Sequence, residues 1–261
     1  MKLHRIYAIV LRNMYGFRHS YDKIVDAFYW PTLDLLLWGL TSAVIQSSSN
    51  GIQNFLLMVV SGIVFWIIFW RGQYEITIGV LDELWNKNLV NIFVTPLKFS
   101  EWVVSWLIMG IIKGVISFGF AFILAYLLYK TNFFVYGFYM LPFLLMLLFS
   151  GWWIGFAIAS IIMRYGTKVQ TLAWSLPWVL APFSAIYYPV SALPESVQLI
   201  ARALPTSYVF EGMRQVVATG KLDWNLIGIS FVLNIFYLCI SFFLLYRSYK
   251  KLLDTGVIKL Y

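Results

Sequence analysis

The sequence predicts an all-α membrane protein with six transmembrane helices. Apolar residues make up 61% of the 261 positions and charged residues only 11%, which is too hydrophobic for a water-soluble domain. The hydropathy supports about six segments of the roughly 20 apolar residues that a spanning helix needs. Little sequence remains outside these segments, so we expect a single transmembrane domain over residues 1–261.

The distribution of basic residues predicts the topology. The expected spans cover residues 31–46, 55–78, 102–129, 134–163, 172–190 and 225–246. Apart from Lys113, which lies inside a span, only four of the 19 Lys and Arg residues fall on one side of the membrane: Lys130, Arg202, Arg214 and Lys221. Because cytoplasmic segments are enriched in Lys and Arg, we expect both termini, the tail 247–261 and the loop 80–100 in the cytoplasm. The predicted location is the cell (inner/plasma) membrane, crossed several times.

Composition and motifs disfavour other classes. The net charge is +8, and the basic residues that produce it lie mostly on one side of the membrane. We therefore expect them to contact anionic membrane lipids, and we predict no nucleic acid as partner. The single cysteine, Cys239, excludes an intrachain disulfide, and no His, Cys or carboxylate cluster has metal-ligand spacing. The chain has no G-x-x-x-x-G-K-[ST], H-E-x-x-H or G-x-S-x-G motif. We therefore predict no catalytic residue, no metal site and no ATP hydrolysis within this chain.

Residues 1–25 read as an amphipathic helix on the cytoplasmic membrane face. This helix is either a membrane anchor or a docking element for a partner. The first span follows, with Pro31 suited to the first position of its helix and Asp34 in the first turn, where a carboxylate favours the positive helix end. Helix capping explains Asp34, but an ionisable residue at the edge of a span is also a functional candidate.

The second and third spans carry further candidate intramembrane polar residues, Glu75 and Lys113. The Lys113 ammonium could extend to the membrane surface, or pair with Glu75 or Asp34, and the sequence leaves these alternatives open. Small residues at helical spacing, Gly110 with Gly114 and Gly151 with Gly155, predict close helix packing. We expect the Gly151 pair to act within the chain, since contact between subunits is the less favoured use.

The loop 80–100 is the longest predicted cytoplasmic loop. A helical stripe of apolar residues precedes Pro96, which ends the expected helix: Leu81, Leu84, Trp85, Leu89 and Ile92. A short exposed amphipathic helix suits docking into a groove of a soluble partner, or lies on lipid. The pattern alone does not decide between these two uses.

The outer segment 177–214 interrupts the helical pattern. Prolines that remove backbone donors recur through it: Pro177, Pro182, Pro189, Pro194 and Pro205. We expect a broken fifth span and two short outer helices within 191–219, one over Glu195–Leu204 and one capped by Thr206 or Ser207. Glu211 and Arg214 in the second helix have the spacing of a local ion pair. Non-helical backbone at membrane depth is expected to line a passage or a protein interface.

Two stretches resemble the ABC-2 type permeases, the membrane subunits of ATP-binding-cassette exporters. The stretch YYPVSALP followed by IARALPTSYVFEGMRQ is similar to the family's outer signature, except that Leu204 stands where the family often has Asn. The matching residues, which the resemblance assigns to an outer gate or re-entrant segment, are Pro189, Pro194, Pro205, Tyr208, Glu211 and Arg214. The stretch DELWNKNLVNIFVTPLKFSEW is similar to the family's cytoplasmic segment in Thr95, Pro96, Leu97 and Glu101. The resemblance covers nearly the whole chain.

The resemblance implies a division of labour between chains. Residues 80–98 would be the coupling helix, seated in a groove of a separately encoded ABC ATPase present in two copies, with ATP and Mg on that ATPase. The implied coupling residues are Asp82, Glu83, Leu84, Trp85, Asn86, Lys87, Thr95 and Pro96. A second permease chain, expected to be identical, would complete a path for efflux of an amphiphilic substrate: a lipid, glycolipid, drug or polysaccharide.

Two other functions remain open from the residues alone. One is an ATP-independent channel or secondary carrier, a class that typically buries several intramembrane charges. The other is a polytopic enzyme acting on lipid-linked substrates. Such an enzyme needs a cluster of acid, base or metal-binding residues at one membrane face, and the outer side offers only scattered carboxylates: Glu195, Glu211 and Asp223.

Overall fold

The fold is a bundle of long helices with short helices at both ends. The computed structural model describes residues 1–48 and 54–255, and these residues contain no β-strand. The α-helices are α1 (Leu3–His19), α2 (Tyr21–Ser48), α3 (Phe55–Trp85), α4 (Leu89–Val94), α5 (Phe99–Tyr129), α6 (Met140–Tyr165), α7 (Leu172–Leu180), α8 (Glu195–Ala203), α9 (Pro205–Thr219) and α10 (Trp224–Thr255). Short 3-10 turns are η1 (Phe133–Tyr139), η2 (Gly166–Val169), η3 (Ala181–Ser184) and η4 (Val190–Ala192).

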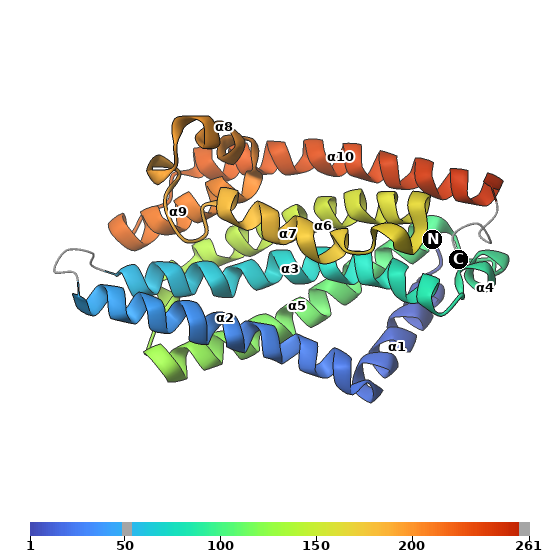
Figure 1. The fold of residues 1–261 in the computed structure, drawn as a ribbon, viewed down its shortest axis with the longest axis horizontal. Helices are drawn as coiled ribbons and strands as arrows, with labels where there is room; N and C mark the ends of the chain where they lie inside the picture. The colour runs from blue at the N-terminus through green and yellow to red at the C-terminus, as the bar shows by residue number, and fades with distance from the viewer. Residues whose placement is uncertain (49–53, 256–261) are drawn as a thin grey trace.

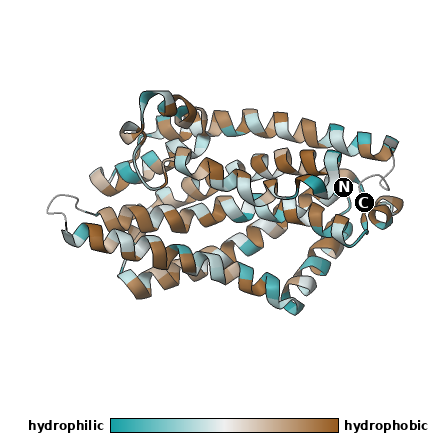
Figure 2. Ribbon diagram, in the orientation of Figure 1, coloured by the Kyte–Doolittle hydropathy of each residue, from teal (hydrophilic) through white to brown (hydrophobic). Residues whose placement is uncertain are grey.

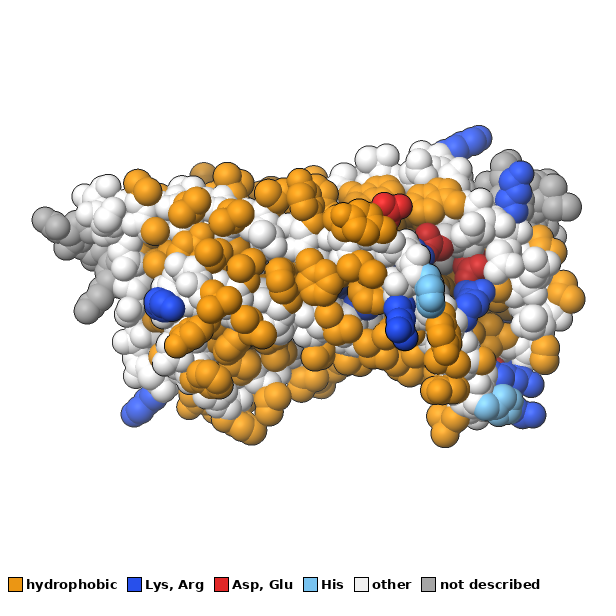
Figure 3. All heavy atoms as spheres, turned by 90° about the horizontal axis from the view of Figure 1, so that it is seen from below, with side chains coloured by type: hydrophobic (Ala, Val, Ile, Leu, Met, Phe, Trp, Pro, Cys, Tyr) orange, Lys and Arg blue, Asp and Glu red, His pale blue; other side chains and the backbone are white. Residues whose placement is uncertain are grey.

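The long helices run along one axis of the molecule (Figure 1). At one end lie α1, α4 and the carboxyl end of α10, while α8 and α9 lie at the opposite end. Apolar residues dominate the long helices, and polar residues are more frequent in α1 (Figure 2). On the face shown in Figure 3, hydrophobic side chains cover most of the surface and charged side chains gather toward the end that carries α1. This distribution is typical of a protein surrounded by lipid.

Four helical segments are long and apolar enough to cross a membrane, among the residues that the structure describes: Phe55–Trp85, Phe99–Tyr129, Phe133–Val169 and Trp224–Asp254. The predicted first and fifth spans are not among them. Charged residues interrupt the apolar character of α2 (Asp22, Lys23, Asp26 and Asp34), and α7 has only nine residues before η3 begins. The structure therefore confirms an all-helical fold with spanning-length helices, and the count of six spans stays a prediction.

The prediction of one amphipathic helix over residues 1–25 is wrong in its extent. Ser20 has extended backbone (φ −108°, ψ 111°), so α1 ends at His19 and α2 begins at Tyr21. Pro31 consequently lies inside α2 instead of at its first position, and Asp34 lies beyond the first turn. The capping explanation for Asp34 does not hold, because the helix starts well before it. The loop residues 49–53 and the end of the tail, 256–261 with Lys259, lie outside the described residues.

The predicted single helix over residues 80–98 is divided in two. The second spanning helix, α3, continues to Trp85, and α4 begins at Leu89. Lys87 adopts a left-handed conformation (φ 52°), which ends α3 because a helix cannot continue through it. The prediction that Pro96 follows the end of the helix is confirmed, since α4 ends at Val94.

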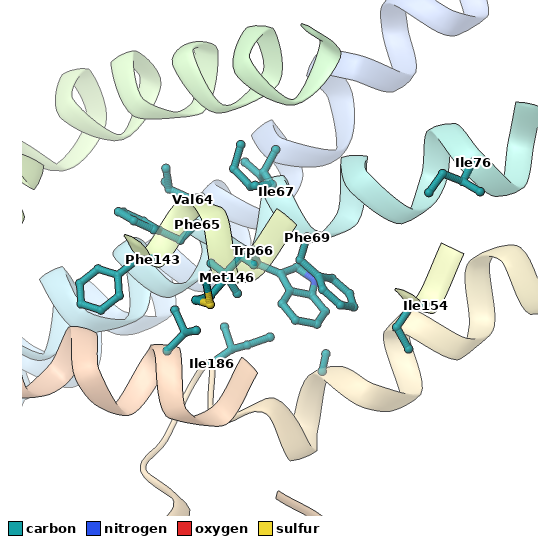
Figure 4. Packing of buried hydrophobic residues seen from close by; sticks show 14 of the residues in the cluster. Val64, Phe65, Trp66, Ile67, Phe69, Ile76, Phe143, Met146, Ile154 and Ile186 are labelled. Carbon is teal, nitrogen blue, oxygen red and sulfur yellow. The ribbon is translucent and has the colours of Figure 1, made fainter. Parts of the chain in front are cut away.

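The core forms around α3, which packs against α6, α5 and α2. In Figure 4, apolar side chains of α3 such as Phe65 and Phe69 lie close to those of α6 such as Met146, and Ile186 from the segment after η3 joins them. Gly151 and Gly155 of α6 lie against α3, where a Cβ on Gly151 would be 2.4 Å from the Phe69 carbonyl oxygen. The predicted role of these glycines in packing within the chain is confirmed.

Candidate functional site

Helix α1 is held to the coupling segment, residues 82–98, and to the start of α5. The Lys2 backbone N–H donates to Glu101 Oε1 at 2.6 Å, and Arg5 forms an ion pair with Glu101 at 3.5 Å. Arg5 also donates to the Pro96 carbonyl oxygen, and Arg12 forms an ion pair with Glu83. The end of α3, α4 and the start of α5 are thus joined to α1 by charged contacts.

The acidic residues assigned to coupling are already paired within the chain. Asp82 Oδ2 accepts from Lys23 Nζ at 2.6 Å, and Glu83, which is buried, accepts from Asn88 Nδ2 at 2.6 Å besides pairing with Arg12. These two carboxylates therefore hold the segment together and are not free for a second chain. Leu84 is buried as well.

The rest of the coupling segment presents an exposed surface. Its solvent-exposed residues, here called the α4 surface, are Trp85, Asn86, Lys87, Val90, Asn91, Val94, Thr95, Pro96 and Lys98. Within it, Trp85 Nε1 donates to Gln170 Oε1 at 3.0 Å, which ties the end of α3 to the turn between α6 and α7. Val94 is 82% exposed although it is apolar. An apolar side chain so exposed at the end of a bundle is suited to contact with another molecule.

A chain of charges, buried except for the partly exposed Asp26, runs through the bundle beside this end. Arg71 in α3 donates to Asp26 Oδ2 at 2.9 Å and lies 3.9 Å from Glu75 Oε1, while Lys113 in α5 donates to Glu75 Oε2 at 2.6 Å. Burial of a charge is costly unless it is paired, and each of these charges has a partner. Of the alternatives open for Lys113, the structure therefore selects the pair with Glu75. Sequence reasoning did not single out Asp26 and Arg71, although Arg71 precedes Glu75 by one helical turn.

A cavity of about 280 Å³ adjoins this chain of charges, between α1, α2, α3 and α5. Arg71, Glu75, Lys113 and Trp106 line it. Arg71 Nε, Glu75 Oε1 and Trp106 Nε1 are buried without a hydrogen-bond partner among the described residues. The cavity thus offers unused donors and an unused acceptor to a polar group.

A second cavity, here called the aromatic cavity, has a volume of about 170 Å³. It lies between α2, α3, α7 and the segment after η3, and Arg71 and Trp174 line both cavities. Its ring-bearing lining residues are Trp30, Trp66, Trp70, Trp174, Trp178 and Tyr187. The carboxylate that lines it is Asp34. Of the candidate intramembrane residues, Glu75 and Lys113 therefore meet in one place, and Asp34 lies in another.

The outer signature residues hold the broken segment onto α9. Arg214 donates to the carbonyl oxygens of Ala185, at 2.8 Å from Nη1, and of Tyr188. Glu211 Oε1 accepts from the Val190 backbone N–H at 2.6 Å. The expected ion pair between Glu211 and Arg214 is not formed, because each side chain binds backbone of the 185–190 segment instead.

The remaining outer residues shape the turns of this segment. Pro189 and Pro194 have extended backbone directly before η4 and α8, and Pro205 is the first residue of α9. The Tyr208 hydroxyl donates to the Arg202 carbonyl oxygen at 2.8 Å. The predicted capping role of Thr206 and Ser207 is wrong, since the helix begins one residue earlier. Their hydroxyls donate to Ser184 Oγ and to the Phe183 carbonyl oxygen inside the bundle.

The fold and these sites define a class: a polytopic helical membrane protein with internal cavities between its spans. In the described residues, no group of three or more His, Cys, Asp or Glu side chains gathers to hold a metal ion. A comparison with protein families matches residues 31–246 to the ABC-2 family transporter proteins. The chain therefore belongs to this family and is a membrane permease subunit of an ABC-type transporter. A search of curated proteins returned no match.

Family membership implies association with an ABC ATPase subunit. The α4 surface and the paired charges behind it lie at one end of the molecule, and the outer signature lies at the other. The two stretches that carry the family resemblance are thus separated by the length of the bundle.

Proposed function

We propose that this chain forms half of the transmembrane path of an ATP-driven exporter, in which two identical permease chains assemble with two copies of a separately encoded ATPase. The exported substance is an amphiphile. ATP and Mg are held by the ATPase, and this chain contributes no nucleotide or metal ligand. The assembly resides in the cell membrane with both termini of the permease in the cytoplasm.

The observation that carries this proposal is the charged connection between α1 and the coupling segment. Arg5 and Arg12 of α1 bind Glu101 and Glu83, which stand at the start of α5 and the end of α3. A partner that moves the α4 surface therefore moves α1, α3 and α5 together. Because α3 is the central helix of the bundle, such a displacement is passed to the walls of both cavities as a rigid-body motion.

In this proposal the outer helices α8 and α9 cap the exit of the path. Arg214 and Glu211 attach the 185–190 segment to α9, so the cap and the lining of the aromatic cavity belong to one unit. Movement of α9 would then change the outer wall of that cavity. The roles of the coupling and outer residues rest on the family resemblance together with these contacts.

The α4 surface is tested by placing a charge on its most exposed apolar residue. We expect Val94→Glu to abolish co-purification of the ABC ATPase subunit from the cells that express this chain, because an ionised carboxylate would have to be buried in the contact. The matched control is Leu199→Glu in α8, an apolar residue that is 70% exposed at the opposite end. Both variants should be produced at equal amounts, and only the first should lose the ATPase in a pull-down. Full retention by Val94→Glu would reject this surface, and absence of any ATPase from the wild-type preparation would favour an ATP-independent carrier.

A further inference from the structure

Asp34 is a carboxylate that has no charged partner among the described residues, unlike the other acidic residues near it in the bundle. Among residues 1–48 and 54–255, its side chain has no hydrogen bond or ion pair. Asp26 and Glu75, by contrast, are bound by Arg71 and Lys113. An unpaired carboxylate facing an apolar cavity is costly to maintain, which makes it a candidate for binding a positively charged group.

We propose that the aromatic cavity binds an organic cation, with Asp34 as its counter-ion and the surrounding rings as its walls. The faces of Trp and Tyr rings carry negative potential and attract cations within about 6 Å of the ring centroid. Rings of this kind enclose the cavity: Trp30, Trp66, Trp70, Trp174, Trp178 and Tyr187. A carboxylate surrounded by aromatic faces selects an ammonium group over a neutral or anionic group of the same shape.

The positive charge that also lines this cavity is already neutralised. Arg71 donates to Asp26 through Nη1 at 2.9 Å and to the Asp26 carbonyl oxygen through Nη2 at 2.6 Å. Its Nη1 atom is also 3.9 Å from Glu75. Arg71 is thus oriented toward two other acidic residues, and the cavity keeps the negative charge of Asp34.

The aromatic walls are held in place before any ligand enters. The Trp66 ring stacks on Phe69 at 4.0 Å between centroids, Tyr187 stacks on Trp38 at 4.6 Å, and Trp178 meets Trp70 edge to face at 5.8 Å. Packed rings lose little conformational entropy when a ligand binds, which favours affinity.

The size and the entrance of the cavity indicate how much of a ligand it holds. A volume of about 170 Å³ accommodates a head group such as a trimethylammonium but not a whole lipid. Trp30 is 48% exposed and Trp178 is 44% exposed, so the cavity opens beside these rings toward the apolar surface of the bundle. The ligand class is therefore an amphiphile whose cationic head enters the cavity while its apolar part stays outside. That this amphiphile is the exported substance rests on the proposed function; its binding does not.

The test is equilibrium dialysis of the purified full-length chain in neutral detergent against radiolabelled choline, a small quaternary ammonium. We expect saturable choline binding that 3,3-dimethyl-1-butanol, the uncharged analogue of the same shape, does not displace. Asp34→Asn should weaken choline binding by about tenfold or more, because it removes the counter-ion and keeps the shape of the side chain. Asp34→Glu should retain most of the binding.

Asp22→Asn is the matched control, because it removes the same charge from the exposed start of the same helix, and it should bind choline like the wild type. Equal choline binding by Asp34→Asn and the wild type, or equal affinity for the uncharged analogue, would overturn the proposal. If Asp34→Asn does not elute as folded protein, Trp30→Leu is tested in its place. This variant keeps the carboxylate and removes one aromatic wall, and we expect it to weaken choline binding severalfold. Full choline binding by Trp30→Leu would also count against it. The experiment needs no ATPase, so its outcome is independent of the ATPase pull-down.

Discussion

Lys113 and Glu75 form a buried ion pair within the bundle, with 2.6 Å between Nζ and Oε2. The two residues come from different helices, α5 and α3. Glu75 is also 3.9 Å from Arg71, so it has a positive charge on either side. These residues hold the two helices in register, because a shift along the axis would separate buried opposite charges.

Removal of one member of this pair has a predictable cost. We expect Lys113→Met to lower the free energy of unfolding by roughly 3–5 kcal/mol, because Glu75 would remain buried with a single, longer ion pair. The measurement is the midpoint of thermal unfolding of the detergent-purified chain. Lys221→Met, the same substitution at an exposed outer residue, serves as the control and should leave the midpoint unchanged. The double variant Glu75→Gln with Lys113→Met should recover much of the loss, and a further decrease would contradict the pairing.

For single residues, the sequence identified the candidate intramembrane charges but not the residues with which they pair. Asp34, Glu75 and Lys113 stand out because ionisable residues are rare in apolar spans, and both carboxylates were possible partners for Lys113. The choice depends on how α2, α3 and α5 are rotated against one another, which hydropathy does not encode. Arg71 was not singled out in the sequence, yet it is only 2% exposed and pairs with Asp26.

Among the helices, α3 and α6 pack closely over an extensive contact in the core. Gly72 of α3 faces Gly151 of α6, and Gly110 of α5 lies on the other side of Gly72. The backbones come together because no side chain separates them, and the remaining space is filled by the larger residues on either side.

A methyl group placed in this contact should separate the helices. We expect Gly151→Ala to lower the thermal midpoint and the yield of folded protein, because its Cβ would lie 2.4 Å from the Phe69 carbonyl oxygen, which belongs to a helix and cannot move alone. Gly119→Ala in α5 is the control, since no atom lies within 4 Å of an added Cβ there. This control should be neutral or stabilising by about 0.5–1 kcal/mol, as Ala favours a helix over Gly. An unchanged midpoint for Gly151→Ala would show that the helices can part at little cost.

Helix positions were predictable from periodicity, but helix ends were not. The short helix α8 was expected from its apolar face, and Pro96 marked the end of α4 correctly. The divisions at Ser20 and Lys87 were missed, because neither residue is a glycine or a proline. Weaker signals were present but not weighed: Ser20 is a preferred N-cap residue and accepts from the Lys23 backbone N–H, and Asn86 and Asn88 flank Lys87. The start of α9 was predicted too late. The helix begins at Pro205, because proline is favoured at the first helical position, and Thr206 and Ser207 lie inside the helix.

The molecule as a whole has its charged contacts at one end and its broken backbone at the other. Sequence reasoning found this polarity from the distribution of Lys and Arg and from the prolines. It also expected spans at α2 and α7. Neither is among the four candidate spans of the described residues, because α2 carries charged residues and α7 is short, so these two spans stay predictions. The cavities could not be expected from the sequence, because each is lined by residues from at least three separate segments.

Helix α1 should transmit force only while its ion pairs to the coupling segment are intact. We expect Arg12→Glu to reduce the amount of ATPase that co-purifies, because a repulsive pair replaces a charged hydrogen bond worth about 1.5–3 kcal/mol. Exchange of both residues, Arg12→Glu with Glu83→Arg, should restore part of the association. The control is Arg18→Glu, the same charge change at an exposed position of the same helix, which should have no effect. Loss of association in all three variants alike would indicate a general effect of charge on α1.

The attachment of the outer segment has an evolutionary consequence. Arg214 and Glu211 bind main-chain atoms of residues 185–190, so these particular contacts do not depend on the identities of the side chains there. Substitutions in the segment would leave these main-chain anchors intact in descendants of this gene, while the buried Ile186 and the stacked Tyr187 remain constrained by packing. The exception is a proline at position 190, which would delete the amide that Glu211 holds.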